Sequence, residues 1–145
     1  MPEIDTARVE RLLVEIEEAL NLIREALMVS KQEFLSDIKS IYAVRYAIIR
    51  IVEAASLLGM YILEAQYGIT PETYSDIFQI LSRRDVISAD VSEGFRRVVG
   101  LRNLIVHRYW VVDDSRIYEE AKGNGLKVIR MFIDEVRRYV REKVR

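Results

Sequence analysis

The sequence predicts an all-α protein, an up-and-down helical bundle of four main helices with short helices between them. Apolar residues recur at spacings of three and four along almost the whole chain, which is the period of an α-helix. Only two prolines and six glycines interrupt the 145 residues. Half of the residues are hydrophobic and 31% are charged, as in a globular protein with its own core. No linker or repeat divides the chain, so we expect residues 1–145 to form a single domain.

The first part of the chain is expected to form a long helix followed by a short one. An apolar stripe predicts the long helix over about residues 5–28, and it comprises Val9, Leu12, Leu13, Ile16, Leu20, Ile23 and Leu27. Ser30 followed by Glu33 has the pattern of a capping box, in which each side chain bonds to the backbone N–H of the other residue. This pattern predicts a short helix over residues 31–35.

The longest helix is expected over residues 38–67, with Gly68 as a left-handed cap at its end. One broad face is apolar and comprises Ile41, Val44, Ala47, Ile48, Ile51, Val52, Ala55, Leu58 and Ile62. The other side is also largely apolar and carries Tyr46, Ile49, Leu57 and Met60. A helix that is apolar nearly all round must be buried nearly all round. We therefore expect a homodimer in which a second copy covers this side, and a central position within the bundle is the alternative.

Three further helix starts are expected in the second half of the chain. Thr70 as N-cap and Pro71 at the first helical position predict a helix over about residues 71–82. Ser88 can cap the next helix, which begins at about residue 89. The run Asp-Asp-Ser at residues 113–115 is expected to start the last helix.

Residues 122–125, Lys-Gly-Asn-Gly, leave the course of the last helix open. One apolar stripe passes through them without a change of phase, and it comprises Ile117, Ala121, Gly125, Val128, Phe132, Val136 and Val140. We expect one helix over about residues 114–143, in which Gly125 lies where another backbone comes close. Glycine in a helix costs about 1 kcal/mol relative to alanine. A turn at residues 123–125 is the alternative.

The composition argues against several classes of protein. The absence of cysteine excludes disulfides and thiolate metal sites, and a single histidine disfavours a histidine-rich zinc site. We therefore expect no metal and no cofactor. No apolar run approaches the roughly 18–20 residues needed to cross a bilayer. The N-terminus also has no signal-peptide pattern, so we expect no membrane partner and a cytoplasmic location.

Arg102 stands in the apolar stripe of the helix that begins near residue 89. With Val91 at 0° and 100° per residue, Arg102 falls at about 20°, between Phe95 at about 40° and Ile105 at about 320°. Burying an unpaired guanidinium costs several kcal/mol or more, so Arg102 needs a carboxylate or a wet cleft that admits an anion. Glu53 is the best candidate carboxylate because it lies on the less apolar side of the long helix. A structural ion pair and a functional site both satisfy this requirement.

His107, the only histidine, follows Arg102 by five residues. On a continuous helix the two side chains point about 140° apart, whereas Asn103 and His107 share a face. Arg102 and His107 can converge on one cleft only if the helix ends or tightens near Val106. A lone histidine at a helix end is more often a cap or a partner of the helix dipole than a catalyst.

The residues Arg102-Asn-Leu-Ile-Val-His107-Arg-Tyr109 resemble the Arg–polar–x3–His–x–Tyr motif of the HepT toxins. These toxins belong to the HEPN superfamily (higher eukaryotes and prokaryotes nucleotide-binding domain). The similarity extends to Phe34-Leu-x-Asp37 and to residues 42–55, which resemble the second and third helices of the family. The resemblance implies a HEPN-type bundle that dimerises.

The resemblance also implies a metal-independent endoribonuclease, in which the 2′-hydroxyl of RNA attacks the adjacent phosphorus. His107 would transfer the proton and Arg102 would stabilise the phosphate charge, with Asn103 and Glu53 in support. One chain has one histidine, and the family arrangement of two Arg–His sets in one dimer cleft would supply both an acid and a base.

Because the net charge is −1, RNA binding would need a local basic patch. Arginines gather around the motif helix and the loop before it, at Arg83, Arg84, Arg96, Arg97, Arg102 and Arg108. We expect Arg96, Arg97 and Arg108 to bind the RNA backbone, and ordinary solvated helix faces are the alternative.

In the family, the tyrosine at the position of Tyr109 receives AMP from a partner nucleotidyltransferase, MntA. The resemblance therefore implies an RNA substrate and an MntA-like antitoxin that silences the toxin, with a homodimer or a higher hetero-oligomer as the assembly. Packing beside Trp110 is the other role open to Tyr109. The alternative function is a non-catalytic HEPN module that binds a nucleotide or a nucleotidyltransferase.

Overall fold

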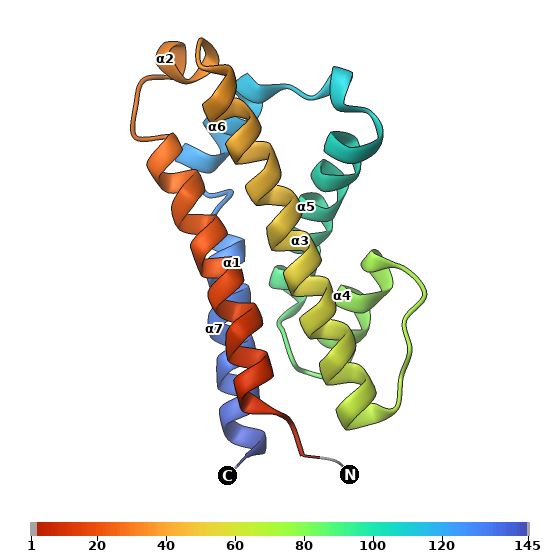
Figure 1. Cartoon of the computed structure of the whole chain (residues 1–145). Helices are drawn as coiled ribbons and strands as arrows, with labels where there is room; N and C mark the ends of the chain where they lie inside the picture. The colour runs from red at the N-terminus through yellow and green to blue at the C-terminus, as the bar shows by residue number, and fades with distance from the viewer. Residues whose placement is uncertain (1–2, 145) are drawn as a thin grey trace.

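The computed structural model describes residues 3–144, and this part of the chain contains helices and no strands, as predicted (Figure 1). The helices are α1 (Thr6–Ala26), α2 (Lys31–Leu35), α3 (Ile38–Tyr67), α4 (Tyr74–Arg83), α5 (Ala89–His107), α6 (Asp114–Lys122) and α7 (Lys127–Lys143). A 3₁₀ turn, η1 (Tyr109–Val111), follows α5.

Most of the predicted helix ends are confirmed. The Ser30 hydroxyl accepts from the N–H of Glu33 at the start of α2, and the Ser88 hydroxyl accepts from the N–H of Val91 at the start of α5. Gly68 ends α3 in the left-handed region with φ 64°, which glycine adopts at little cost. Local capping chemistry therefore sets these boundaries.

The predicted start of α4 is wrong by three residues. The N-cap is Thr73, whose hydroxyl accepts from the N–H of Asp76, and the first helical residue is Tyr74. Thr70 and Pro71 do not begin a helix. The N–H of Ile69 still bonds to the carbonyl of Leu63 in the cap of α3, so the chain has only just left that helix.

The prediction of one continuous helix over residues 114–143 is also wrong. The chain breaks between α6 and α7, where the N–H of Gly125 donates to the carbonyl of Glu120 at 2.8 Å. A Cβ at Gly125 would lie 2.7 Å from that carbonyl oxygen, so the turn requires glycine there. The stripe keeps its phase because both helices bury their apolar faces in the same core, as Ile117 and Phe132 show.

α3 forms the centre of the bundle (Figure 1). The contact between α1 and α3 is the most extensive between any two helices of the described chain. α7 lies beside α1 and α5. α4 and α5 pack on the other side of α3. Stacked and tilted phenylalanine rings join α4, α5 and α7, with Phe78 and Phe95 4.7 Å apart and Phe95 and Phe132 4.8 Å apart between ring centroids.

Contrary to expectation, α3 contains an 18-residue stretch with a mean hydropathy of 1.6, which is long and apolar enough to cross a membrane. The core accounts for this, because 61% of the apolar stretch is buried inside the molecule. Its predicted broad face is buried, whereas Tyr46 and Leu57 on the other side stay exposed in the single chain. A second copy covering this side remains a prediction.

Candidate functional site

The end of α5 carries the predicted site. α5 ends at His107, next to Val106, where the sequence left a helix end open, and the N–H of Arg108 donates to the carbonyl of Leu104 at 2.8 Å. Arg108 leaves the helix with φ −143°, and the chain turns directly into η1. His107 is therefore the last helical residue, where the helix dipole favours a positive charge. Its side chain is exposed.

Arg102 points from α5 into the bundle, with only 16% of its side chain exposed. Its Nη2 donates to Oε1 of Glu53 on α3 at 2.9 Å, so the carboxylate predicted as its partner is the one it meets. Its Nη1 donates to Oδ1 of the neighbouring Asn103 at 3.1 Å. Within the described residues, Nε of Arg102 is buried without a hydrogen-bond partner. The guanidinium thus retains unused donor capacity after it has paired with Glu53.

Tyr74, the first residue of α4, completes this cluster and was not predicted from the sequence. Its hydroxyl donates to both carboxylate oxygens of Glu53, at 3.0 and 2.9 Å. The Arg102 guanidinium carbon lies 5.1 Å from the centroid of the Tyr74 ring, within the range of a cation–π contact. Burial and the hydrogen bond to Glu53 raise the pKa of the Tyr74 phenol, so it stays a proton donor. Because the start of α4 was misplaced, nothing in the sequence marked this residue.

The structure does not join His107 to Arg102 by any hydrogen bond within the described residues. α5 is helical through both, so their side chains point about 140° apart. Asn103 and Arg96 lie within about 40° and about 20° of His107 around the helix. Arg102 therefore belongs to the inner face of α5, and His107, Asn103 and Arg96 belong to its outer face.

The predicted basic rim is only partly continuous. Arg96 is exposed and pairs with Glu93 at 3.3 Å, whereas Arg97 lies about 80° away from His107 around the helix. Arg97 and Arg108 are exposed and have no carboxylate partner among the described residues. Arg83 and Arg84 precede α5, so its length of roughly 28 Å separates them from His107. Besides Arg102, only Arg96, Arg97 and Arg108 of the predicted rim therefore lie on α5 or directly after it, and their binding of RNA stays a prediction.

Tyr109 is presented to solvent rather than packed inside, with an exposed fraction of 62%. Its ring meets that of Trp110 edge to face at 5.4 Å between centroids. Nη1 of Arg45 donates to the Tyr109 carbonyl at 3.5 Å, and the same guanidinium pairs with Asp114 at 2.7 Å. These contacts fasten η1 and the start of α6 to α3, so the phenol is exposed on a fixed backbone.

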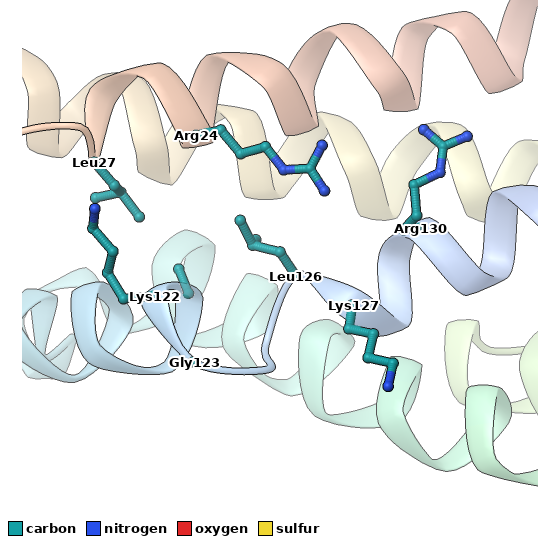
Figure 2. A pocket seen from close by; sticks show the side chains of 8 residues that line it. Arg24, Leu27, Lys122, Gly123, Leu126, Lys127 and Arg130 are labelled. Carbon is teal, nitrogen blue, oxygen red and sulfur yellow. The ribbon is translucent and has the colours of Figure 1, made fainter.

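Away from this cluster, the described residues form surface hollows but no metal site. No group of three or more His, Asp or Glu side chains could hold a metal ion among residues 3–144. A hollow of about 380 Å³ lies between α1, α6 and α7 (Figure 2), and Arg102 is not among the residues that line it. Four basic residues line it: Arg24, Lys122, Lys127 and Arg130. They do not converge on one point, because Arg130 pairs with Glu17 and Lys127 extends away from Arg24.

The chain matches the family model described as "Ribonuclease HepT-like" over residues 16–136. It is also 30% identical over 130 residues to a protein of Archaeoglobus fulgidus that is provisionally described as an RNase. That alignment covers 88% of this chain and 94% of the archaeal protein.

Solved structures share the fold. A tri-AMPylated Shewanella oneidensis HEPN toxin in complex with its MNT antitoxin superposes with a TM-score of 0.82 at 21% identity, covering 90% of this chain and 97% of that one. YutE, a Bacillus subtilis cytosolic protein of unknown function, superposes with a TM-score of 0.84 at 18% identity, covering 99% and 96%. These likenesses establish the predicted HEPN-type helical fold.

Proposed function

This chain belongs to the HepT-like ribonuclease family, and we propose that it is a toxin endoribonuclease that cuts RNA without a metal ion. The observation that carries the proposal is the arrangement of the family motif at the end of α5. Arg102 is held by Glu53 and Tyr74, and His107 is exposed at the helix end five residues later. Asn103 lies beside Arg102 in sequence and on the side of His107 in space.

Histidine and arginine side chains suffice for the chemistry. The 2′-hydroxyl of RNA attacks the adjacent phosphorus, gives up its proton to a base, and forms a 2′,3′-cyclic phosphate. The 5′-oxygen leaves and takes a proton from an acid. Histidine can serve in either proton role near neutrality, and the charge of arginine stabilises the phosphorane oxygens.

A single chain has one histidine, so acid and base can both be histidines only if a second copy supplies the other one. We infer a twofold homodimer that brings two Arg102–His107 sets to one cleft. The exposed side of α3, where Leu57 is 55% exposed, supports this assembly because it leaves apolar surface to be covered. Arg96, Arg97 and Arg108 would hold the RNA backbone at its rim.

Cleavage is tested on full-length protein with single-stranded RNA in EDTA. Wild type should leave 2′,3′-cyclic ends, and His107→Ala and Arg102→Ala should each lower the rate by about 100-fold or more. Arg24→Ala, in the hollow of Figure 2, is a control that should keep full activity. Cleavage that occurs with added Mg²⁺ but is lost in EDTA would overturn the proposal.

We propose that a nucleotidyltransferase antitoxin switches the toxin off by modifying Tyr109. The phenolic oxygen would attack the α-phosphorus of ATP and release pyrophosphate, leaving a bulky anion two residues from His107. The exposed phenol supports this, and a structural neighbour is a tri-AMPylated HEPN toxin bound to its antitoxin. Incubation with such an antitoxin and ATP should add the mass of AMP to wild type and not to Tyr109→Phe.

One observation favours a second function, a non-catalytic helical module that binds a nucleotide or a nucleotidyltransferase. Arg102 already has a carboxylate partner, as a purely structural residue would. Such a module predicts a folded protein without cleavage, in which His107→Ala changes nothing. Glu53 is 40% exposed and keeps its bond to Tyr74, so solvent would limit the cost of losing the ion pair itself to about 1 kcal/mol. Activity therefore separates the two functions better than stability does.

A further inference from the structure

Four large aromatic side chains are exposed together where the first half of α3 meets η1. Tyr42 is 60% exposed, Tyr46 62%, Tyr109 62% and Trp110 67%. Aromatic side chains of this size normally bury most of their area, so a group of them in water marks an interaction surface. We call these four residues the aromatic platform.

The platform is held by a fixed framework rather than by a loose loop. Nε and Nη2 of Arg45 donate to the two carboxylate oxygens of Asp114 at 2.9 and 2.7 Å, and both side chains are less than one-fifth exposed. The Arg45 guanidinium carbon also lies 5.9 Å from the Tyr42 ring centroid. The contacts of Arg45 with Asp114 and with the Tyr109 carbonyl therefore place α3 and η1 relative to each other, and the rings stay exposed on a rigid support.

The platform adjoins the proposed catalytic residues. Tyr42 and Tyr46 are one turn apart on α3, and Glu53 lies two turns beyond Tyr46 on the same side of the helix. Tyr109 follows His107 by two residues, so the other edge of the platform begins at the end of α5. Anything bound across the platform would pass beside the Arg102–His107 site. The second copy of the proposed dimer would cover the Leu57 end of this side of α3, about three turns beyond Tyr46, and would leave the platform open.

We propose that the aromatic platform binds the unstacked bases of single-stranded RNA next to the cleavage point. This inference rests on the proposed ribonuclease function. Aromatic faces with unpaired cations beside them are the chemistry that recognises single-stranded nucleic acid. Here the exposed Arg108, without a carboxylate partner among the described residues, stands between His107 and Tyr109 and supplies that charge. A duplex hides its base faces, so the platform selects single strands.

Trp110 is the only tryptophan in the chain, so its fluorescence reports on the platform alone. Full-length His107→Ala protein is titrated with a short single-stranded oligoribonucleotide and with the same strand annealed into a duplex. The single strand should quench the fluorescence to saturation, and the duplex should not. Fluorescence that changes with the protein concentration but not with added RNA would mean that a second copy covers the platform. This result would overturn the proposal.

Substitutions in the same background test the individual rings. Tyr46→Ala should raise the Kd for the single strand about tenfold, and Tyr46→Phe should restore most of the affinity because it keeps the ring face. Val14→Ala, on α1, is the control for a lost exposed apolar side chain. Equal affinity in Tyr46→Ala and in the control would also overturn the proposal.

The outcomes separate this proposal from the ribonuclease function. If wild type cuts RNA but Tyr46→Ala in the active protein has an unchanged KM for single strands, the function stands and the platform proposal fails. If His107→Ala binds single strands with a quench while wild type cuts nothing, the platform stands and the nuclease function fails.

Discussion

Arg102 is held from two elements at once. Glu53 on α3 takes one N–H of the guanidinium, and the Tyr74 ring on α4 lies against the guanidinium. The Tyr74 hydroxyl donates to the same carboxylate, which shares its negative charge between two donors. Arg102 is thus oriented without being fully neutralised, as a phosphate-binding arginine should be.

This arrangement makes Tyr74 a positioning residue. Tyr74→Phe keeps the ring and removes the hydroxyl, so Glu53 should pair more strongly with Arg102. We expect kcat for RNA cleavage to fall roughly three- to tenfold while KM and the melting temperature change little. The matched control is Tyr67→Phe, because the Tyr67 hydroxyl forms a hydrogen bond with Tyr139 rather than with Glu53. Equal kcat values in the two variants would refute the positioning role.

At the scale of residues, the sequence predicted that Arg102 needs a charge partner but not how the cluster around it is arranged. The helical wheel showed that Arg102 must have a partner, and Glu53 was the correct carboxylate. The sequence did not identify Tyr74 as a site residue because its role depends on where α4 begins. The N-cap of α4 is Thr73 rather than the predicted Thr70. The same wheel also kept Arg102 and His107 on different faces, as the structure has them.

Among the elements, the break between α6 and α7 shows the limit of periodicity. An apolar stripe records which faces meet the core, and two helices packed on one core can keep a common phase. The decisive fact is the carbonyl of Glu120 close to Gly125, which no pattern of residue types displays.

Two glycine substitutions should therefore have opposite effects on stability. Gly125→Ala places a methyl group 2.7 Å from the Glu120 carbonyl oxygen and should lower the free energy of unfolding by about 1–3 kcal/mol. Gly100→Ala in α5 meets open space and should raise it by up to about 1 kcal/mol. Urea unfolding of both variants measures this, and a neutral Gly125→Ala would contradict the close turn.

The seam between α1 and α7 depends on charge. Glu17 accepts from Arg137 at 2.7 Å and from Arg130 at 3.2 Å. The hydrogen bond from Arg137 is the main cause that lowers the pKa of the Glu17 carboxyl below its ordinary value of 4.5, against a smaller opposing effect of burial.

A lowered folded-state pKa gives this seam a defined pH window. The contribution of Glu17 to stability is fully present above about pH 4.5 and is lost as the pH falls through the lower folded-state pKa. The difference in unfolding free energy between wild type and Glu17→Gln should therefore be constant near neutrality and shrink below about pH 4.5. Urea unfolding across this range measures it, and a difference that persists unchanged in acid would exclude this role.

For the whole molecule, the all-α class follows from the period of the apolar residues, because a single core imposes that period on each helix. Assembly is a different matter. The sequence predicts that a second copy covers part of α3, and Leu57 is exposed in the single chain, but neither the sequence nor the single chain shows which surface of the second copy would cover it.

A mixing experiment tests the composite site at this scale. Wild-type and His107→Ala subunits, co-expressed with different tags, should form heterodimers whose shared cleft holds one histidine. We expect the purified heterodimer to cleave RNA at least about tenfold more slowly than the wild-type dimer, because one of the two proton roles is lost. A heterodimer that keeps half or more of the wild-type rate would show that each chain cuts RNA on its own. Sedimentation of wild type at micromolar concentration as a monomer would have the same meaning.

The hydropathy of α3 has a consequence for how the chain is made. A segment this apolar is a hazard while it emerges from the ribosome, since it can aggregate or enter a bilayer before it is covered. α1 precedes it in the chain and is the helix that packs along it most extensively. Only a short connection with α2 separates them, so this helical pair can close at a small cost in loop entropy. α1, which covers the apolar face of α3, is therefore synthesised before α3 itself.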